Sequence, residues 1–299
     1  MKIKINENSI SFETLKIQSH NALTIIPLKS ETSNTTDILT LNKGFDLGLV
    51  EVKECEVEDV NNILITNNAV TPLILVDGEE IIGAKQNRIV NNTILVPPKT
   101  TMKISVSCTE RDRWSYKNNK SVLFEESQYF ANSNTRRAKA SAIDERSRQD
   151  NVWDSIDLFS DRCSTRPDTS AMNDCYEDFS QDQDEFLKSF DLSVGQSGII
   201  AIINNEVVGL ELFNSPDIYA NYHDKIIKSY IIDSLDYKEI DISYEANINE
   251  IINNISNSVF IKQEAHGLGE LIKFTNDYGS GSALIYEDEI IHMPYFKDI

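Results

Sequence analysis

Short aliphatic runs separated by polar turns recur along the chain, and this pattern predicts many short strands. In the first part, strands are expected over residues 22–27, 45–52, 62–66, 72–76, 93–96 and 102–108, and residues 39–41 form a short strand or begin a helix. Asp77-Gly78 lies between two apolar runs, which is a strong signal for a hairpin turn. The pattern indicates a β-rich segment over residues 1–115.

Residues 116–192 have a different pattern, because their apolar side chains recur at helical spacing. One helix is expected from Arg136 to Gln149, and beyond it Val152, Ile156 and Phe159 share one helical face. Another is expected over residues 170–190, after a loop over 160–170. We therefore predict a helical insertion over residues 116–192.

Residues 193–299 return to strands. A hairpin is expected over 198–213 with its turn at Asn204-Asn205, and strands over 259–263, 271–275, 282–286 and 289–293. Helices are expected over 215–235, opened by Ser215-Pro216, and over 247–257. The predicted fold class is α+β, with mainly antiparallel sheet in two β-rich halves and a helical segment between them. The three segments are expected to form one compact domain.

The charge is unevenly distributed. The formal net charge is −20, and such an acidic surface makes binding to nucleic-acid backbones unlikely. Residues Lys85–Arg148 nevertheless hold 13 Lys/Arg against 6 Asp/Glu, whereas the rest of the chain holds 15 against 42. Either this basic segment is ordinary surface patterning with internal ion pairs, or it forms a pocket for an anionic small molecule.

Other features of the sequence exclude several classes of protein. The four cysteines form no CxxC pair, no apolar run approaches the length of a membrane span, and the first residues lack a signal-peptide core. We therefore expect a cytoplasmic protein that does not enter a membrane. The four histidines have no metal-ligand spacing, and no nucleotide-binding glycine fingerprint occurs, so no metal site is expected. The sequence leaves open whether a cofactor is bound and which oligomeric state the protein adopts.

The stretch LVDGEEIIGAKQNRIV (75–90) combines core-like aliphatic residues with charges. If residues 79–90 form one strand, Lys85 and Asn87 lie on one face at its polar end, and Gln86 and Arg88 lie on the other. Lys and Arg at such a place are suited to binding phosphate or carboxylate. The alternative is an ordinary strand whose charged end is solvated or ion-paired.

Two further segments are candidates for chemistry. The first follows a predicted strand, where Cys108 is either a candidate nucleophile or a small side chain packed in the core. Glu110 and Arg113 are either an ion pair in a loop or a general base beside an anion-binding group. Trp114 either stacks on a ligand or packs in the core. On the predicted helix, Arg137, Ser141, Glu145 and Arg148 fall on one stripe. Gln149 and Trp153 lie one turn apart and are expected to face the same pocket.

The segments LVDGEEIIGAKQNRI, VPPKTTMKISVSCTERDRW and GIIAIINNEVVGLELFNSP together resemble the ARPP-1 domain, the "ARG and Rhodanese-Phosphatase-superfamily-associated Protein" domain. The family name records an association with ADP-ribosylglycohydrolases and rhodanese/phosphatase proteins, and so implies ADP-ribose or NAD-derived nucleotide metabolism. By motif match, the resemblance implies functional roles for the family's polar positions, which are Glu79, Glu80, Lys85, Gln86, Asn87, Arg88, Glu110, Arg113 and Trp114, and more weakly Gln149 and Trp153.

Three functions are compatible with these residues. In the first, the protein binds or hydrolyses a phosphorylated small molecule such as an ADP-ribose derivative: Lys85, Arg88 and Arg113 anchor phosphate, Trp114 stacks, and Glu80 or Glu110 is the general base. In the second, a non-catalytic protein uses the same side chains as an internal ion-pair network. The third, a nucleic-acid factor, is disfavoured by the net charge.

Overall fold

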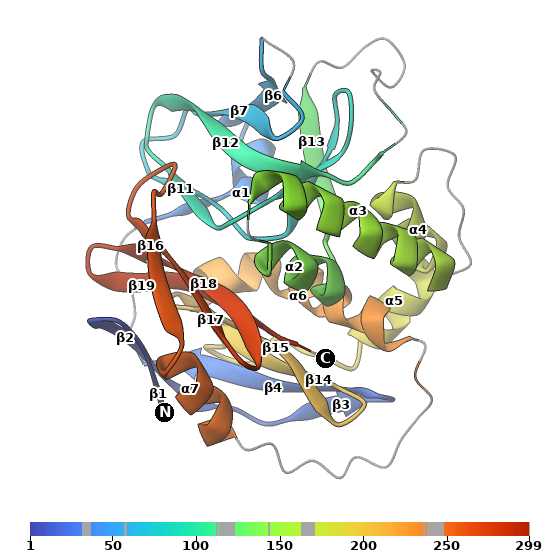
Figure 1. Ribbon diagram of the computed structural model, residues 1–299, viewed down its shortest axis with the longest axis vertical. Helices are drawn as coiled ribbons and strands as arrows, with labels where there is room; N and C mark the ends of the chain where they lie inside the picture. The colour runs from blue at the N-terminus through green and yellow to red at the C-terminus, as the bar shows by residue number, and fades with distance from the viewer. Residues whose placement is uncertain are drawn as a thin grey trace. The chain divides into compact units, whose positions relative to one another are not determined.

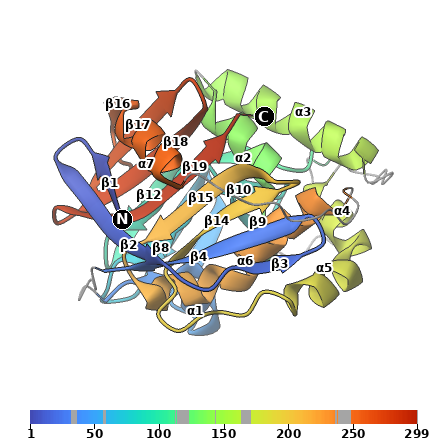
Figure 2. The ribbon, with the colours of Figure 1, turned by 90° about the horizontal axis from the view of Figure 1, so that it is seen from below.

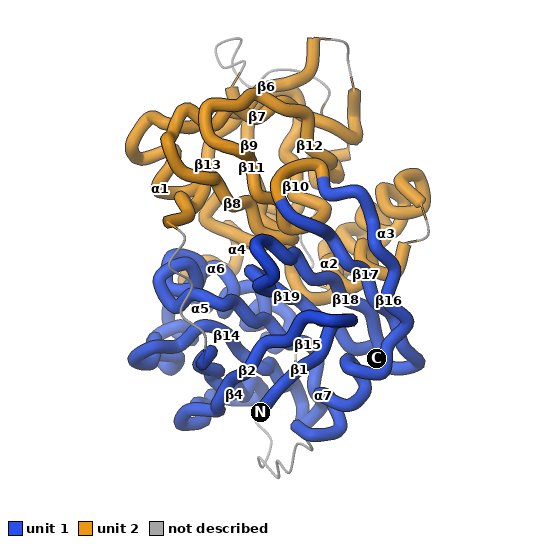
Figure 3. The backbone as a smooth tube through the Cα atoms, turned by 90° about the vertical axis from the view of Figure 1, so that its left-hand side faces the viewer, with its two compact units in different colours: residues 1–36, 182–265, 269–299 blue, residues 37–181, 266–268 orange. Residues whose placement is uncertain are grey.

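The computed structural model describes residues 1–31, 37–56, 59–111, 113, 123–142, 144–162, 171–235, 237 and 248–298. The chain divides into two compact units (Figure 3). Unit 1 comprises residues 1–36, 182–265 and 269–299, and unit 2 comprises residues 37–181 and 266–268. Both units are built mainly from antiparallel strands with a smaller number of helices, so the predicted α+β fold class is confirmed.

Unit 1 is built around one ten-stranded sheet, which contains strands from both ends of the chain, joined through β14 and β15 (Figure 2). The order is β1-β2-β4-β14-β15-β19-β18-β17-β16, with β3 paired to β4, and every pairing is antiparallel. The strands are β1 Lys2–Ile5, β2 Asn8–Thr14, β3 Gln18–His20, β4 Leu23–Ser30, β14 Gly198–Ile203, β15 Glu206–Phe213, β16 Val259–Gln263, β17 Glu270–Asn276, β18 Gly279–Tyr286 and β19 Glu289–Lys297.

Strand β14 is a continuous aliphatic run that is entirely buried, because helices pack on the sheet to which it belongs. Helix α6 (Pro216–Ser234) packs on β4, β14 and β15, and α7 (Ile248–Ser256) packs on β1 and β17. Ile200 and Ile202 belong to the same apolar cluster as Ile251 and Ile255 of α7. A strand covered on both faces needs no polar alternation, which explains its sequence. Helix α5 (Ser180–Leu187) precedes this part of the chain.

Unit 2 contains two smaller sheets, which share an apolar cluster that includes Leu75, Ile81, Val90 and Val106. The six-stranded sheet has the order β13-β9-β10-β12-β7-β6, and the three-stranded sheet has the order β11-β8-β5. The strands are β5 Leu39–Thr40, β6 Val50–Glu54, β7 Asn62–Asn67, β8 Leu73–Leu75, β9 Glu79–Gly83, β10 Arg88–Val90, β11 Ile94–Val96, β12 Thr100–Cys108 and β13 Phe124–Phe130. Only β5 and β8 pair in parallel among these described strands.

The helices of unit 2 include a consecutive pair, α2 and α3, which lie side by side in Figure 1. The helices of unit 2 are α1 Leu41–Asp46, α2 Ser133–Ala140, α3 Glu145–Arg162 and α4 Met172–Asp178. The predicted helix over 136–149 is therefore two helices, and the stripe from Arg137 to Arg148 is divided between them. The segment expected to be helical also contains a strand, β13, which pairs with β9.

Several local predictions are confirmed. Asn204 and Asn205, both with positive φ, form the turn between β14 and β15, and Ser215 caps α6 through the amide of Ile218. The Asp77-Gly78 prediction is wrong, because β8 and β9 do not pair with each other: β8 pairs with β5 and β11, and β9 pairs with β10 and β13. In the part of the chain that the structure describes, no helix is both long and apolar enough to cross a lipid bilayer.

Candidate functional site

The segment 79–90 is a hairpin and not one strand, so the predicted division of its side chains between two faces is wrong. Strand β9 ends at Gly83, β10 begins at Arg88, and Arg88 pairs with Ile81. Gly83 and Ala84 have φ values of 115° and 40°, which turn the backbone, and Asn87 Oδ1 accepts a hydrogen bond from Gly83 N at 3.1 Å. Lys85, Gln86 and Asn87 consequently lie in the turn.

Glu110 and Arg113 form a buried, two-pronged ion pair beside this turn. Arg113 Nε lies 2.7 Å from Glu110 Oε1, and Arg113 Nη2 lies 2.6 Å from Glu110 Oε2. Arg113 also donates to the carbonyl of Ala84 at 2.8 Å, while Glu110 Oε2 accepts from the backbone N–H of Asn87 at 3.2 Å. The pair therefore fastens the turn to the end of β12, and the carboxylate of Glu110 has no solvent exposure.

Arg88 and its neighbours extend this network. Arg88 is fully buried and donates from Nη1 to Gln86 Oε1 at 3.0 Å and to the carbonyl of Asn87 at 3.3 Å. Its Nη2 lies 3.8 Å from Glu54 Oε1, which also accepts from the backbone amide of Lys85 at 3.2 Å. The side chain of Gln86 in turn donates to the carbonyl of Glu110. The KQNR residues thus bind one another and the neighbouring backbone.

Glu80 lies in a separate buried position on β9. Thr109 Oγ1 donates to its Oε1 at 3.1 Å, and Ser127 Oγ donates to its Oε2 at 2.8 Å. Burial raises the pKa of Glu80 to about 8, and the two hydroxyl groups oppose the rise. Burial therefore favours the protonated form of Glu80 at neutral pH. Its neighbour Glu79, also buried, accepts a hydrogen bond from the amide of Val76.

Gln149 joins α3 to the end of β12. Its amide accepts from Cys108 N at 2.8 Å and donates to Cys108 O at 3.0 Å, so it replaces the partner that another strand would supply. Burial raises the pKa of the Cys108 thiol, which disfavours the thiolate that a nucleophile requires. Trp153 is half-buried, and the Arg111 guanidinium lies 5.1 Å from its ring centre. Trp114 lies outside the described residues.

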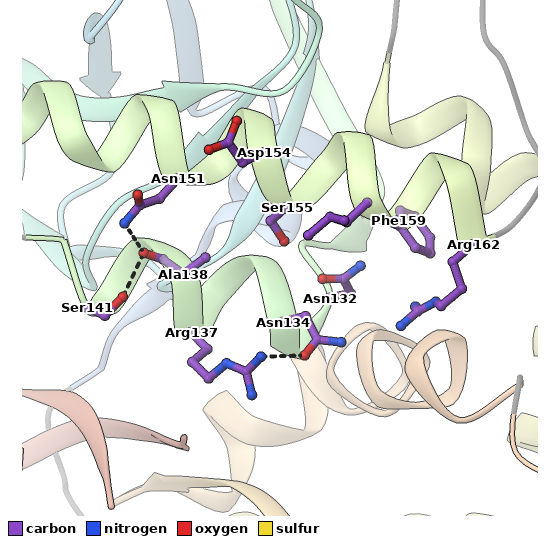
Figure 4. A pocket seen from close by; sticks show the side chains of 11 residues that line it. Asn132, Asn134, Arg137, Ala138, Ser141, Asn151, Asp154, Ser155, Phe159 and Arg162 are labelled. Atoms are coloured by element: carbon purple, nitrogen blue, oxygen red, sulfur yellow. Dashed lines mark hydrogen bonds between the residues drawn. The ribbon is translucent and has the colours of Figure 1, made fainter. Parts of the chain in front are cut away.

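A pocket of about 540 Å³ lies along α2 and α3 (Figure 4). This volume falls in the range of small-molecule sites. Its lining combines three amides, two guanidinium groups, two hydroxyls and one carboxylate with three apolar side chains. The lining residues are Asn132, Asn134, Arg137, Ala138 and Ser141 at α2, and Asn151, Asp154, Ser155, Leu158, Phe159 and Arg162 on α3.

Asn132 contributes a buried donor to this pocket. It is the N-cap of α2, and its Oδ1 accepts a hydrogen bond from Thr135 N at 2.7 Å. Because the capping bond requires an acceptor, it identifies that atom of the amide as oxygen, and the other atom is the donor Nδ2. Asn132 has no solvent exposure, and Nδ2 has no hydrogen-bond partner among the described residues. An unpaired buried donor costs about 1–3 kcal/mol, which a ligand or a water molecule would recover.

The two arginines of the pocket are held in different ways. Arg137 Nη2 donates to Asn134 Oδ1 at 3.0 Å, one helical turn away on α2. The Arg162 guanidinium lies 5.4 Å from the ring centre of Phe159, and Phe159 is itself buried. Planar guanidinium groups fixed in this manner are suited to binding phosphate or carboxylate, because they lose little side-chain entropy on binding.

Sequence reasoning missed this pocket, apart from Arg137, Ser141 and Phe159, which it noted for other reasons. A signal was present, because the lining residues repeat at helical spacing: 134, 137, 138 and 141 on α2, and 151, 154, 155, 158, 159 and 162 on α3. Recognising it required the break between the helices, which turns two polar stripes towards one space. No group of His, Cys, Asp or Glu among the described residues has an arrangement suited to a metal ion.

Comparison with known proteins identifies one protein family. The family model of ARPP-1, the ARG and Rhodanese-Phosphatase-superfamily-associated Protein domain, matches residues 11–296. The match includes both the β9–β10 hairpin and the α2–α3 pocket, and it confirms the family resemblance of the sequence motifs. No curated protein and no solved structure matches the chain.

Proposed function

The chain belongs to the ARPP-1 family, and on this basis we propose that it binds a phosphorylated small molecule in the α2–α3 pocket. The association that the family name records favours an ADP-ribose-type or other NAD-derived nucleotide as the ligand. The observation that carries the proposal is the lining of the pocket, where Arg137, Arg162 and the unpaired amide of Asn132 supply donors to one space.

The charge of the pocket supports an anionic ligand. Its ionisable lining residues are two arginines and one carboxylate, Asp154, within a chain whose formal net charge is −20. Local positive charge in an acidic protein concentrates anions there and disfavours extended polyanions elsewhere on the surface. The apolar side chains of Ala138, Leu158 and Phe159 would contact a non-polar part of the ligand.

The KQNR hairpin and the Glu110–Arg113 pair have a different part in this proposal. The side chains of Gln86, Asn87, Arg88, Glu110 and Arg113 are hydrogen-bonded within the protein, and neither Glu80 nor Glu110 is exposed to solvent. The proposal gives them the task of fixing β9, β10 and β12 beneath the pocket helices, with Gln149 as the link to α3. Catalysis by Glu80 or Glu110 would require a change of conformation that admits water and substrate.

The burial of these motif side chains also favours a second candidate, a non-catalytic protein whose charges serve only its architecture. The two candidates differ in ligand binding. A thermal-shift and calorimetric screen should use ADP-ribose, NAD, ADP and ribose 5-phosphate with the wild type, Arg137→Gln and, as a charge control, Arg146→Gln. Arg146 is exposed on α3 and does not line the pocket.

We expect at least one of these compounds to raise the melting temperature of the wild type and of Arg146→Gln, and to have a smaller effect on Arg137→Gln. Arg88→Gln should lower the melting temperature of the free protein while retaining the ligand-induced rise. If no compound binds the wild type, the phosphate-binding proposal fails and the architectural candidate is favoured.

A further inference from the structure

We infer that the end of the pocket formed by Asn132, Phe159 and Arg162 receives the ring of a nucleobase, so that the pocket selects nucleotides over simple sugar phosphates. The inference rests on the proposed function, because it assigns one part of the ligand to one part of the same pocket. It adds that the base lies at one end of the pocket and the phosphate at the other, and that the base must offer a hydrogen-bond acceptor.

The first observation is the fixed polarity of Asn132. An asparagine in a pocket can normally present either its oxygen or its nitrogen, but here Oδ1 is occupied by the cap of α2. Asn132 lines the pocket, and its Nδ2 is the buried amide atom that has no hydrogen-bond partner in the described parts of the chain. Its complement is a hydrogen-bond acceptor, which a base supplies as a ring nitrogen or a ring carbonyl.

The second observation is the planar surface beside this amide. Arg162 is exposed, and its guanidinium is held 5.4 Å from the centre of the buried Phe159 ring. Phe159 also contacts Tyr176, with 5.6 Å between the ring centres, so the ring is fixed from a second direction. A guanidinium over an aromatic ring can also stack on a base, because it offers both a π face and a positive charge.

The third observation concerns the phosphate. Arg137 is the second guanidinium of the pocket, and Figure 4 shows Asn134 and Asn132 between it and Arg162. Arg137 is already oriented by Asn134, at 3.0 Å. A ligand with a base at Asn132 and phosphate at Arg137 would therefore use both ends of the pocket. A sugar phosphate has no planar ring to stack on Arg162.

The test compares two probes that share the ribose and the phosphate and differ in the base. Calorimetry should measure AMP and ribose 5-phosphate against the wild type, Asn132→Ser, Asn132→Asp and Arg137→Gln. Serine and aspartate are good N-caps, so both Asn132 variants should retain α2 while removing the amide donor. Serine adds no charge, and thus separates loss of the donor from repulsion of phosphate.

We expect the wild type to bind AMP at least about 10-fold more tightly than ribose 5-phosphate, since a matched donor and a stacked base each contribute at this level. Asn132→Ser should weaken AMP binding by about 10-fold and leave ribose 5-phosphate binding unchanged, whereas Arg137→Gln should weaken both. Equal affinity of the wild type for the two probes, or equal loss of both in Asn132→Ser, would overturn the base assignment and leave the phosphate site standing. Absence of binding by either probe and by the other phosphorylated compounds would overturn the proposed function itself.

Discussion

Asp77 Oδ2 lies 2.6 Å from Lys139 Nζ, although the first residue follows β8 and the second lies on α2. Asp77 Oδ1 also accepts from Arg136 Nε at 3.3 Å, and Lys139 donates to the carbonyls of Val90 and Asn91. Burial lowers the pKa of Lys139 to about 8, and the Asp77 carboxylate opposes this shift. The pair fastens α2, and with it the α2 side of the pocket, to the sheets of unit 2.

Lys139→Met should lower the free energy of unfolding by about 3 kcal/mol, because it leaves the Asp77 carboxylate buried with one of its charged partners removed. Chemical denaturation with urea at neutral pH would measure the change. The double variant Asp77→Asn, Lys139→Met should cost less than the sum of the two single variants. Additive losses would show that the two side chains stabilise the fold independently.

Glu80→Gln should change how stability depends on pH. The folded-state pKa of Glu80, about 8, lies above its ordinary value of 4.5. The stability that this group contributes is therefore complete below pH 4.5 and is lost as the pH rises towards 8, at up to about 1.4 kcal/mol per pH unit. Glutamine resembles the protonated acid and does not titrate, so the variant should lose less stability over this range.

Urea denaturation of the wild type and Glu80→Gln at several values between pH 5 and 8 would measure this difference. Glu125→Gln, an exposed carboxylate on β13, is the matched control and should keep the wild-type profile. Parallel profiles for the wild type and Glu80→Gln would contradict a buried, protonated Glu80.

Arg113→Lys should destabilise the protein by about 2 kcal/mol, because an ammonium group cannot reproduce the two-pronged contact with Glu110. The control is Arg111→Lys, whose partner is Asp157 at 3.1 Å, with both side chains about half exposed. Exposed pairs contribute little, so this substitution should change stability by less than about 0.5 kcal/mol. Comparable losses at the two positions, measured by thermal and urea denaturation, would refute a special role for the buried pair.

Gly78→Ala should lower the free energy of unfolding more than Gly48→Ala, although both glycines have positive φ, at 80° and 64° respectively. A Cβ atom at Gly78 would lie 2.5 Å from Arg136 Nε, whereas nothing lies within 4 Å of one at Gly48. The backbone penalty of about 1–2 kcal/mol is common to both, so the excess at Gly78 reports crowding against Arg136. Equal unfolding free energies for the two variants would exclude that crowding.

The sequence by itself determined most elements of the fold, because their signals are local. The aliphatic run of β14, the Asn204-Asn205 turn and the Ser215 cap of α6 each depend on residues that are neighbours in the chain. The α+β class follows from the number of such short runs. The sequence also determines the basic character of residues Lys85–Arg148, because this depends only on the number of charged residues.

Only the tertiary structure decided which segments pair and where the pocket lies. Pairing between β4 and β14 joins the start of the chain to its second half, and the sequence pattern within either strand does not predict which strand it pairs with. The charge of Arg88 could suit a ligand or the protein interior, and in the structure Arg88 is buried, donates to Gln86 and lies 3.8 Å from Glu54. The free donor of Asn132 likewise depends on a cap that forms only where α2 begins, and on α3 returning beside it. These outcomes depend on contacts between distant residues, which local patterns of side chains do not encode.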